Sequence, residues 1–144
     1  MTYAHAVHSV DRPQLASALA RAMAAEQDRT GRAPLDCFIQ VSLDGDAGGH
    51  RGGALPADVP ALAGQLAGAK GLRLAGVMAV APFGEDPAPA FEKLAEISAR
   101  LTADHPGASG ISAGMSQDLE VAVRFGATHL RVGSDILGPR PALR

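Results

Sequence analysis

The feature that most constrains the fold of this chain is a regular alternation between short apolar runs and longer amphipathic runs. The short runs predict strands at 3–10, 35–43, 72–80, 109–113 and 128–132. Between them, apolar residues at helical spacing, bounded by prolines and glycines, predict helices at 13–30, 56–70, 87–103 and 117–125. The order β-α-β-α-β-α-β-α-β predicts five parallel strands joined by right-handed crossover helices.

Two architectures fit this order of elements. Five parallel strands are too few to close a (β/α)8 TIM barrel, so the chain forms either an open doubly wound sheet or a partial barrel. Both architectures place their ligands at the carboxyl ends of the strands. The length of 144 residues fits a single domain over 1–144. We therefore expect one α/β domain with its site at the strand ends.

Composition and charge exclude several classes of function. A net charge of -2 gives no basic surface for nucleic acid, and no apolar run approaches the length of a membrane span. The start of the chain lacks a signal-peptide pattern, so a cytoplasmic location is expected. Cys37 is the single cysteine, which excludes an internal disulfide. His5 and His8 fall on opposite faces of a strand, and no metal site is expected.

Two glycine- and serine-containing turns follow the last two predicted strands. They are Gly114-Met115-Ser116 and Arg131-Val132-Gly133-Ser134. In barrels, a phosphate is often held by the loops after the last two strands, where backbone N–H groups and a helix N-terminus favour an anion. The same residues also fit a plain helix N-cap at Ser116, a plain turn at Gly133, and an arginine that pairs with a carboxylate.

Nucleotide-binding loops are absent from the sequence. No GxGxxG fingerprint follows the first strand, which argues against a dinucleotide cofactor. The glycine-rich segment 44–53 lacks the GK[ST] ending of a P-loop. We expect this segment to be an irregular surface loop.

Five segments of the chain, taken together and in this order, resemble one known family. They are His8-Ser9-Val10-Asp11-Arg12, Phe38-Ile39-Gln40-Val41-Ser42-Leu43-Asp44, Leu74-Ala75-Gly76-Val77-Met78-Ala79, Ser112-Ala113-Gly114-Met115-Ser116-Gln117-Asp118-Leu119-Glu120 and Leu130-Arg131-Val132-Gly133-Ser134. The family is that of the YggS/PROSC pyridoxal phosphate homeostasis proteins. The resemblance spans His8 to Gly138, and it implies a barrel like the N-terminal domain of alanine racemase. It thus favours the partial barrel.

The resemblance also implies a cofactor, pyridoxal 5'-phosphate, and the residues that bind it. Gly114, Met115 and Ser116 match one phosphate-binding element of the family, and Gly133 and Ser134 match the other. Arg131 matches the arginine near the pyridine nitrogen, where a cation keeps that nitrogen unprotonated and weakens the ring as an electron sink. The resemblance therefore implies a carrier of the cofactor with no catalytic residues.

One departure from the family concerns its Schiff-base lysine. The family begins with about three further strands, and the first of them bears this lysine, whereas this chain begins at what resembles the fourth. Lys70 precedes a strand at the opposite end of the sheet, and Lys93 lies within a helix. We therefore expect a homologue truncated at its N-terminus that binds the cofactor without catalysis.

Two other functions stay open at this point. The shared fold also fits an amino-acid racemase, although the absent lysine opposes it. Alternatively, the chain is active only with a partner chain that supplies the missing strands. Free sheet edges at 3–10 and 128–132 would also favour self-association.

Overall fold

The computed structural model describes residues 3–43 and 52–138, which form an α/β fold around one parallel sheet. The strands are β1 (Ala6–Val10), β2 (Leu35–Gln40), β3 (Leu72–Met78) and β4 (Gly110–Ser112). Most of the predicted glycine-rich loop, residues 44–51, and the chain end from 139 lie outside the described residues.

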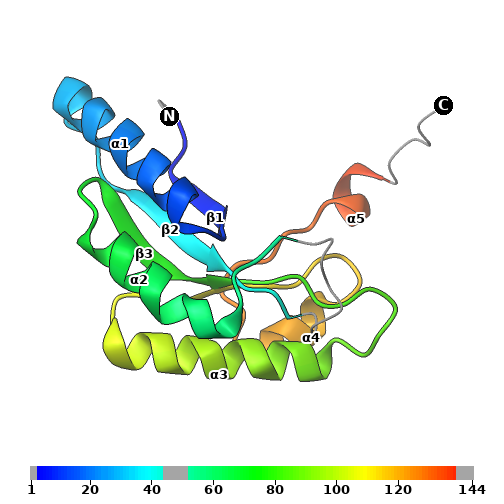
Figure 1. Cartoon of the computed structure of the whole chain (residues 1–144). Helices are drawn as coiled ribbons and strands as arrows, with labels where there is room; N and C mark the ends of the chain where they lie inside the picture. Colours follow the sequence, from blue (N-terminus) through cyan, green and yellow to red (C-terminus); the bar gives the residue numbers. More distant parts are fainter. Residues whose placement is uncertain (1–2, 44–51, 139–144) are drawn as a thin grey trace.

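Helices alternate with the strands as the sequence predicts (Figure 1). They are α1 (Pro13–Thr30), the 3-10 turn η1 (Pro56–Asp58), α2 (Val59–Gly68), α3 (Ala88–Asp104), α4 (Leu119–Arg124) and α5 (Ser134–Leu137). A proline and a glycine set the bounds of α1. Pro13 occupies its first turn, and Gly31 ends it in the left-handed conformation, where its N–H donates to the Gln27 carbonyl.

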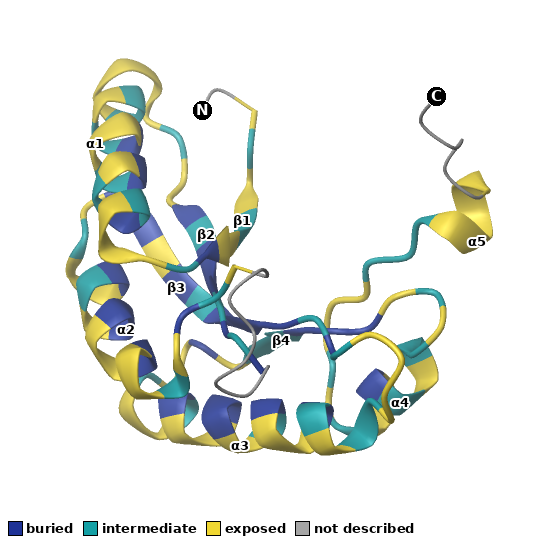
Figure 2. Cartoon of the chain, turned by 45° about the vertical axis from the view of Figure 1, so that its right-hand side comes forward, coloured by how far each residue is buried: buried dark blue, intermediate teal, exposed yellow. Residues whose placement is uncertain are grey.

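The strand order decides between the two architectures. All three pairings are parallel, and the order is β1-β2-β3-β4, without the reversal that defines a doubly wound sheet. Crossovers of one hand between successive strands place the crossover helices α1, α2 and α3 on the same face. Figure 2 shows α1, α2 and α3 following one another along the convex side of the curved sheet. This arrangement is that of a partial barrel, as expected.

The hydrophobic core fills the space between the convex face of the sheet and the helices. Its largest fully buried apolar side chains are Phe91, Met23, Leu35, Ile39, Leu66, Leu94, Val10, Val77 and Cys37. Burial of each large apolar side chain contributes about 1.5 to 3 kcal/mol. Burial also raises the pKa of the Cys37 thiol to about 11, so this side chain stays protonated and packs as an apolar group.

Two glycines that face each other, Gly76 on β3 and Gly110 on β4, leave no room for a side chain between the two strands. A Cβ on Gly76, whose φ is +152°, would lie 1.8 Å from the Gly110 carbonyl oxygen. A Cβ on Gly110 would lie 2.6 Å from the ring of Phe38. The Phe38 ring therefore lies over the backbone of β4.

The prediction of a fifth strand at 128–132 is wrong. Only an isolated bridge forms there, between Ser112 and His129. The reason is local: the Thr128 hydroxyl contacts both backbone groups of Ile111, at 2.9 Å from its N and 3.2 Å from its O. The Thr128 hydroxyl therefore takes part in hydrogen bonds with the Ile111 N–H and C=O, the groups that regular strand pairing would use.

The segment nevertheless follows β4 toward its carboxyl end. The Ala113 N–H donates to the His129 carbonyl at 3.1 Å, and the Arg131 N–H donates to the Gly114 carbonyl at 2.9 Å. Arg131 is thus fixed beside the end of β4 even though no strand forms. The short helix α5, which the sequence did not predict, follows and lies apart from the helices that cover the sheet (Figure 1).

Candidate functional site

The turn after β4 has a conformation that requires glycine. Gly114 has a φ of +94°, and a Cβ there would lie 2.8 Å from the Cβ of Ala122. The next residue, Met115, donates its backbone N–H to the carboxylate of Asp118 at 2.6 Å. The Met115 N–H is therefore already paired, and the Met115 side chain is exposed at the surface.

Ser116 and Ser134, from the two predicted phosphate-binding elements, lie together. The Ser134 hydroxyl donates to the Ser116 Oγ at 3.1 Å, and the Asp135 backbone N–H donates to the same oxygen at 3.3 Å. Ser116 thus accepts two hydrogen bonds, and no described atom accepts its own hydroxyl hydrogen. Ser116 is not a plain N-cap, because Asp118 occupies that position before α4.

Gly133 lies next to this serine pair and keeps the surface open. A Cβ built on it would meet no atom within 4 Å, so its backbone borders free space. Gly133 precedes α5 as its N-cap, which fits the alternative of a plain turn residue. In the described part of the chain, the backbone N–H groups of Gly133 and Ser134 donate to no acceptor.

Arg131 is clamped by two uncharged acceptors. Its Nη1 donates to the Ser112 Oγ at 2.8 Å, and its Nη2 donates to the Ala79 carbonyl at 3.0 Å. Among the described residues it forms no ion pair with a carboxylate, so the alternative of a salt-bridged arginine is not observed. Burial lowers the pKa of Arg131, while the negative charge of Asp118 acts in the opposite direction.

The structure adds two residues that the sequence analysis did not assign to the site, His8 and Ser112. The His8 Nδ1 lies 2.8 Å from the Ser112 Oγ, which joins β1 to β4 across the sheet. The His8 ring stacks on Phe38, with the ring centroids 4.3 Å apart, and the His129 ring meets both edge-on. Both residues lie within the segments that carry the family resemblance, but strand spacing alone could not reveal a contact between residues 104 positions apart.

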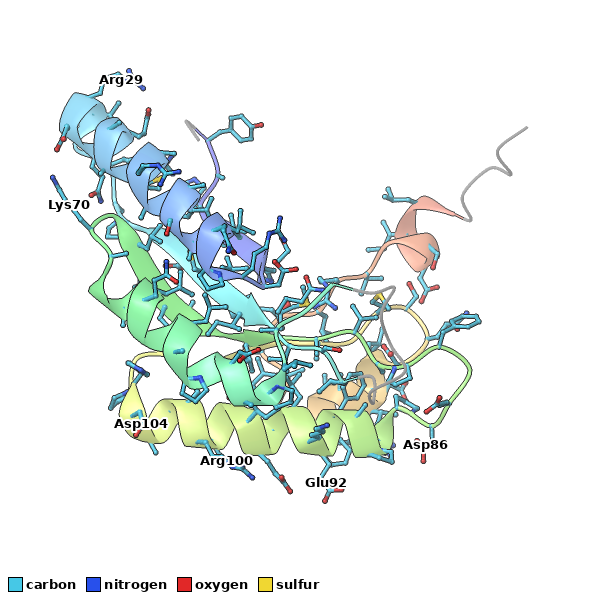
Figure 3. All side chains as sticks on the ribbon, in the orientation of Figure 1. Arg29, Lys70, Asp86, Glu92, Arg100 and Asp104 are labelled. Carbon is cyan, nitrogen blue, oxygen red and sulfur yellow. The ribbon has the colours of Figure 1, made fainter. Side chains whose placement is uncertain are left out.

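The two lysines of the chain lie away from these residues, as the sequence predicts. Lys70 lies at the amino end of β3 and pairs with Asp28 at 3.0 Å. Figure 3 shows it beside the end of α1 that carries Arg29. Lys93 is exposed on α3. Neither lysine reaches the carboxyl ends of the strands.

The described residues form neither a metal site nor a membrane span. Nowhere in 3–43 or 52–138 do three His, Cys, Asp or Glu side chains gather in a way that could hold a metal ion. Within the same residues, no helix combines the length and the apolar character that crossing a membrane requires.

Comparison with known proteins places this geometry in context. The family model of the alanine racemase N-terminal domain matches residues 1–141. The pyridoxal phosphate homeostasis protein of Mycobacterium tuberculosis is 46% identical over 143 residues, which cover 96% of this chain and 54% of that protein. Its counterpart from Mycobacterium leprae is 44% identical over 141 residues, covering 95% of this chain and 54% of that protein. The chain thus spans about half the length of these relatives.

A solved structure supports the same relationship. PipY of Synechococcus elongatus, in a structure with pyridoxal phosphate bound, matches with a TM-score of 0.78 and 31% identity. The match covers 93% of this chain and 61% of that chain.

Proposed function

This chain belongs to the alanine racemase N-terminal domain family, and we propose that it binds pyridoxal 5'-phosphate at its strand ends without catalysing a reaction on it. The observation that carries the proposal is that the Ser116 and Ser134 hydroxyl oxygens lie 3.1 Å apart. Ser134 is close in sequence to Arg131, a half-buried arginine that forms no ion pair with a carboxylate among the described residues. Proteins named for pyridoxal phosphate homeostasis, and a relative with this cofactor bound, support the choice of ligand.

The donor set of the site fits the phosphate of this cofactor. Two serine hydroxyls and the backbone N–H groups of Gly133 and Ser134 can all donate to phosphate oxygens. The open space around Gly133 lets a ligand approach the backbone closely. The Met115 N–H would first have to leave Asp118, so we assign Met115 and Gly114 to shaping the turn.

Arg131 would face the pyridine nitrogen of the bound cofactor. A guanidinium donates hydrogen bonds and does not accept them, so it favours an unprotonated ring nitrogen. The cofactor itself supplies an aldehyde and an electron-accepting ring, which an unprotonated nitrogen weakens as an electron sink. This arrangement suits binding and release of the cofactor rather than amino-acid chemistry.

The proposal of a non-catalytic role also rests on the lysines. Covalent pyridoxal phosphate enzymes use a lysine amine at the cofactor. Lys70 lies at the opposite end of β3, and Lys93 is exposed on a helix. We further propose a cytoplasmic location for this activity.

Isothermal titration calorimetry of the chain with pyridoxal 5'-phosphate tests this function. We expect saturable binding that inorganic phosphate displaces, and much weaker binding of pyridoxal, which lacks the phosphate. A chain that binds both compounds equally, or neither, would contradict the proposal. An assay for racemisation of alanine should give no turnover, and measurable turnover would overturn the non-catalytic role.

A further inference from the structure

We propose that His8 and Ser112 are positioning residues for Arg131, and that neutral His8 keeps the guanidinium in place for the ring end of the cofactor. This inference rests on the proposed function. It goes beyond that function because it adds two residues to the site and makes cofactor affinity depend on the protonation of one histidine.

A continuous chain of hydrogen bonds connects the three side chains. Arg131 Nη1 lies 2.8 Å from Ser112 Oγ, and Ser112 Oγ lies 2.8 Å from His8 Nδ1. Ser112 is completely buried, so water cannot replace either partner. The second clamp on Arg131, the Ala79 carbonyl, is a backbone group just after β3. The guanidinium is therefore held by a side chain of β4 and by the backbone of the residue that follows β3.

The direction of these hydrogen bonds follows from the chemistry of the groups. A guanidinium can only donate, so the Ser112 oxygen accepts from Arg131. The hydroxyl of Ser112 has one hydrogen, and His8 Nδ1 is the acceptor within reach. His8 must then present a lone pair at Nδ1 and carry its hydrogen on Nε2. A buried hydroxyl without an acceptor would be costly, which further favours this arrangement.

Protonation of His8 would break the series of hydrogen bonds from Arg131 through Ser112 to His8 at its His8 end. Nδ1–H would point at an oxygen that already accepts from Arg131, and the Ser112 hydrogen would lose its acceptor. The charged or titratable groups near the His8 ring are His129 and Arg131, both of which oppose a positive charge, whereas Phe38 stacks on it without charge. Burial is the largest cause that lowers the pKa of His8 from its ordinary value of 6.5.

The pH dependence follows with a definite sign. Because the pKa of His8 is lowered in the folded chain, the neutral form persists through neutral pH. It is lost only as the pH falls below the ordinary value of 6.5. Affinity for the ring end of the cofactor should therefore be retained at neutral pH and decline in acid.

Two substitutions of His8 distinguish the effect of its hydrogen-bond acceptor from the effect of its aromatic ring. His8→Phe keeps an aromatic ring to stack on Phe38 but removes the acceptor. His8→Asn keeps an acceptor near the position of Nδ1 and cannot carry a charge. We expect His8→Phe and Ser112→Ala to weaken pyridoxal phosphate binding roughly three- to tenfold, the equivalent of a net hydrogen bond. We expect His8→Asn to retain most of the affinity at neutral pH.

Inorganic phosphate serves as the matched probe, because it lacks the ring. Its affinity should change less than that of the cofactor in both His8→Phe and Ser112→Ala. In acid, the ratio of cofactor affinity to phosphate affinity should fall for the wild-type chain and fall less for His8→Asn. Equal losses of affinity for the cofactor and for phosphate would overturn the inference. The same pH profile in the wild-type chain and in His8→Asn would also overturn it.

A nuclear magnetic resonance measurement tests the chain of hydrogen bonds without any ligand. Nitrogen chemical shifts of the His8 ring, assigned by their loss in His8→Asn, should show the hydrogen on Nε2 at neutral pH. A hydrogen on Nδ1, or a charged ring, would overturn the inference even if the cofactor binds. Failure of the wild-type chain to bind the cofactor would instead refute the proposed function, so the two failures are distinguishable.

Discussion

Ser116 and Ser134 are the residues on which the proposed phosphate site most depends. Their hydroxyls come from two loops and meet at 3.1 Å, and each could donate to a phosphate oxygen. A hydrogen bond to a charged group is worth about 1.5 to 3 kcal/mol. We therefore expect the double substitution Ser116→Ala and Ser134→Ala to weaken phosphate binding by roughly tenfold or more, as measured by calorimetry.

Ser109 provides the matched control for this pair. It is an exposed serine directly before β4, at the amino end of the strand rather than the carboxyl end. Ser109→Ala should leave phosphate affinity unchanged. If the double variant binds as tightly as the control, the phosphate lies elsewhere.

The two lysines allow a chemical test of where the cofactor binds. Borohydride reduction of the chain with pyridoxal phosphate, followed by peptide mass spectrometry, should find the pyridoxyl group on neither Lys70 nor Lys93 at stoichiometric yield. The reason is distance from the strand ends: Lys70 pairs with Asp28 beside the amino end of β3, and Lys93 is exposed on α3. Stoichiometric labelling of Lys70 would show that the site has been placed at the wrong end of the sheet.

At the scale of elements, the contact between β3 and β4 depends on Gly76. A Cβ there would lie 1.8 Å from a backbone oxygen, and its φ of +152° is one that other residues rarely adopt. We expect Gly76→Ala to lower the free energy of unfolding by more than about 3 kcal/mol, since backbone atoms must move apart. Thermal unfolding followed by circular dichroism measures this change.

Gly64 is a suitable control because its surroundings are open. It lies within α2, and a Cβ there would meet nothing within 4 Å. Gly64→Ala should stabilise the chain by about 0.4 to 1 kcal/mol, because alanine loses less backbone freedom on folding. A small effect of Gly76→Ala, similar in size to that of Gly64→Ala, would mean that the space between β3 and β4 can accept a side chain at this position.

The elements also show what can and cannot be predicted from the sequence. Four of the five expected strands form, because apolar periodicity reports burial against helices, which is local information. The strand expected at 128–132 does not form, because the Thr128 side chain shares the backbone groups of Ile111. Hydrophobic pattern carries no information about such a side-chain hydrogen bond.

The candidate site was predictable to a similar extent. Its place at the strand ends follows from any parallel α/β order, and the family resemblance assigns Ser116, Ser134 and Arg131. The link from Arg131 through Ser112 to His8 was not predictable, because it depends on the curvature that brings β1 and β4 together.

At the scale of the whole molecule, the outer edge of β1 has no partner strand among the described residues. An unpaired strand edge can pair with another chain, so we expect self-association at high concentration. Ala6→Lys places a charge on an exposed residue of this edge and should shift the chain toward the monomer. Size-exclusion chromatography with light scattering gives the mass of each form.

Ala99→Lys on α3 is the control for this experiment. It adds the same charge at another exposed alanine, on a helix. It should leave the mass distribution unchanged. A wild-type chain that stays monomeric at all concentrations would contradict the expectation, as would equal effects of the two lysines.

We propose that this partial barrel holds the phosphate of pyridoxal 5'-phosphate between the turn after β4 and the segment 131–134. A crystal structure of the chain with this cofactor tests it most directly. We expect the phosphate in contact with Ser116 and Ser134, and the pyridine nitrogen next to Arg131. Cofactor found at the amino ends of the strands, or bound to Lys70, would contradict it.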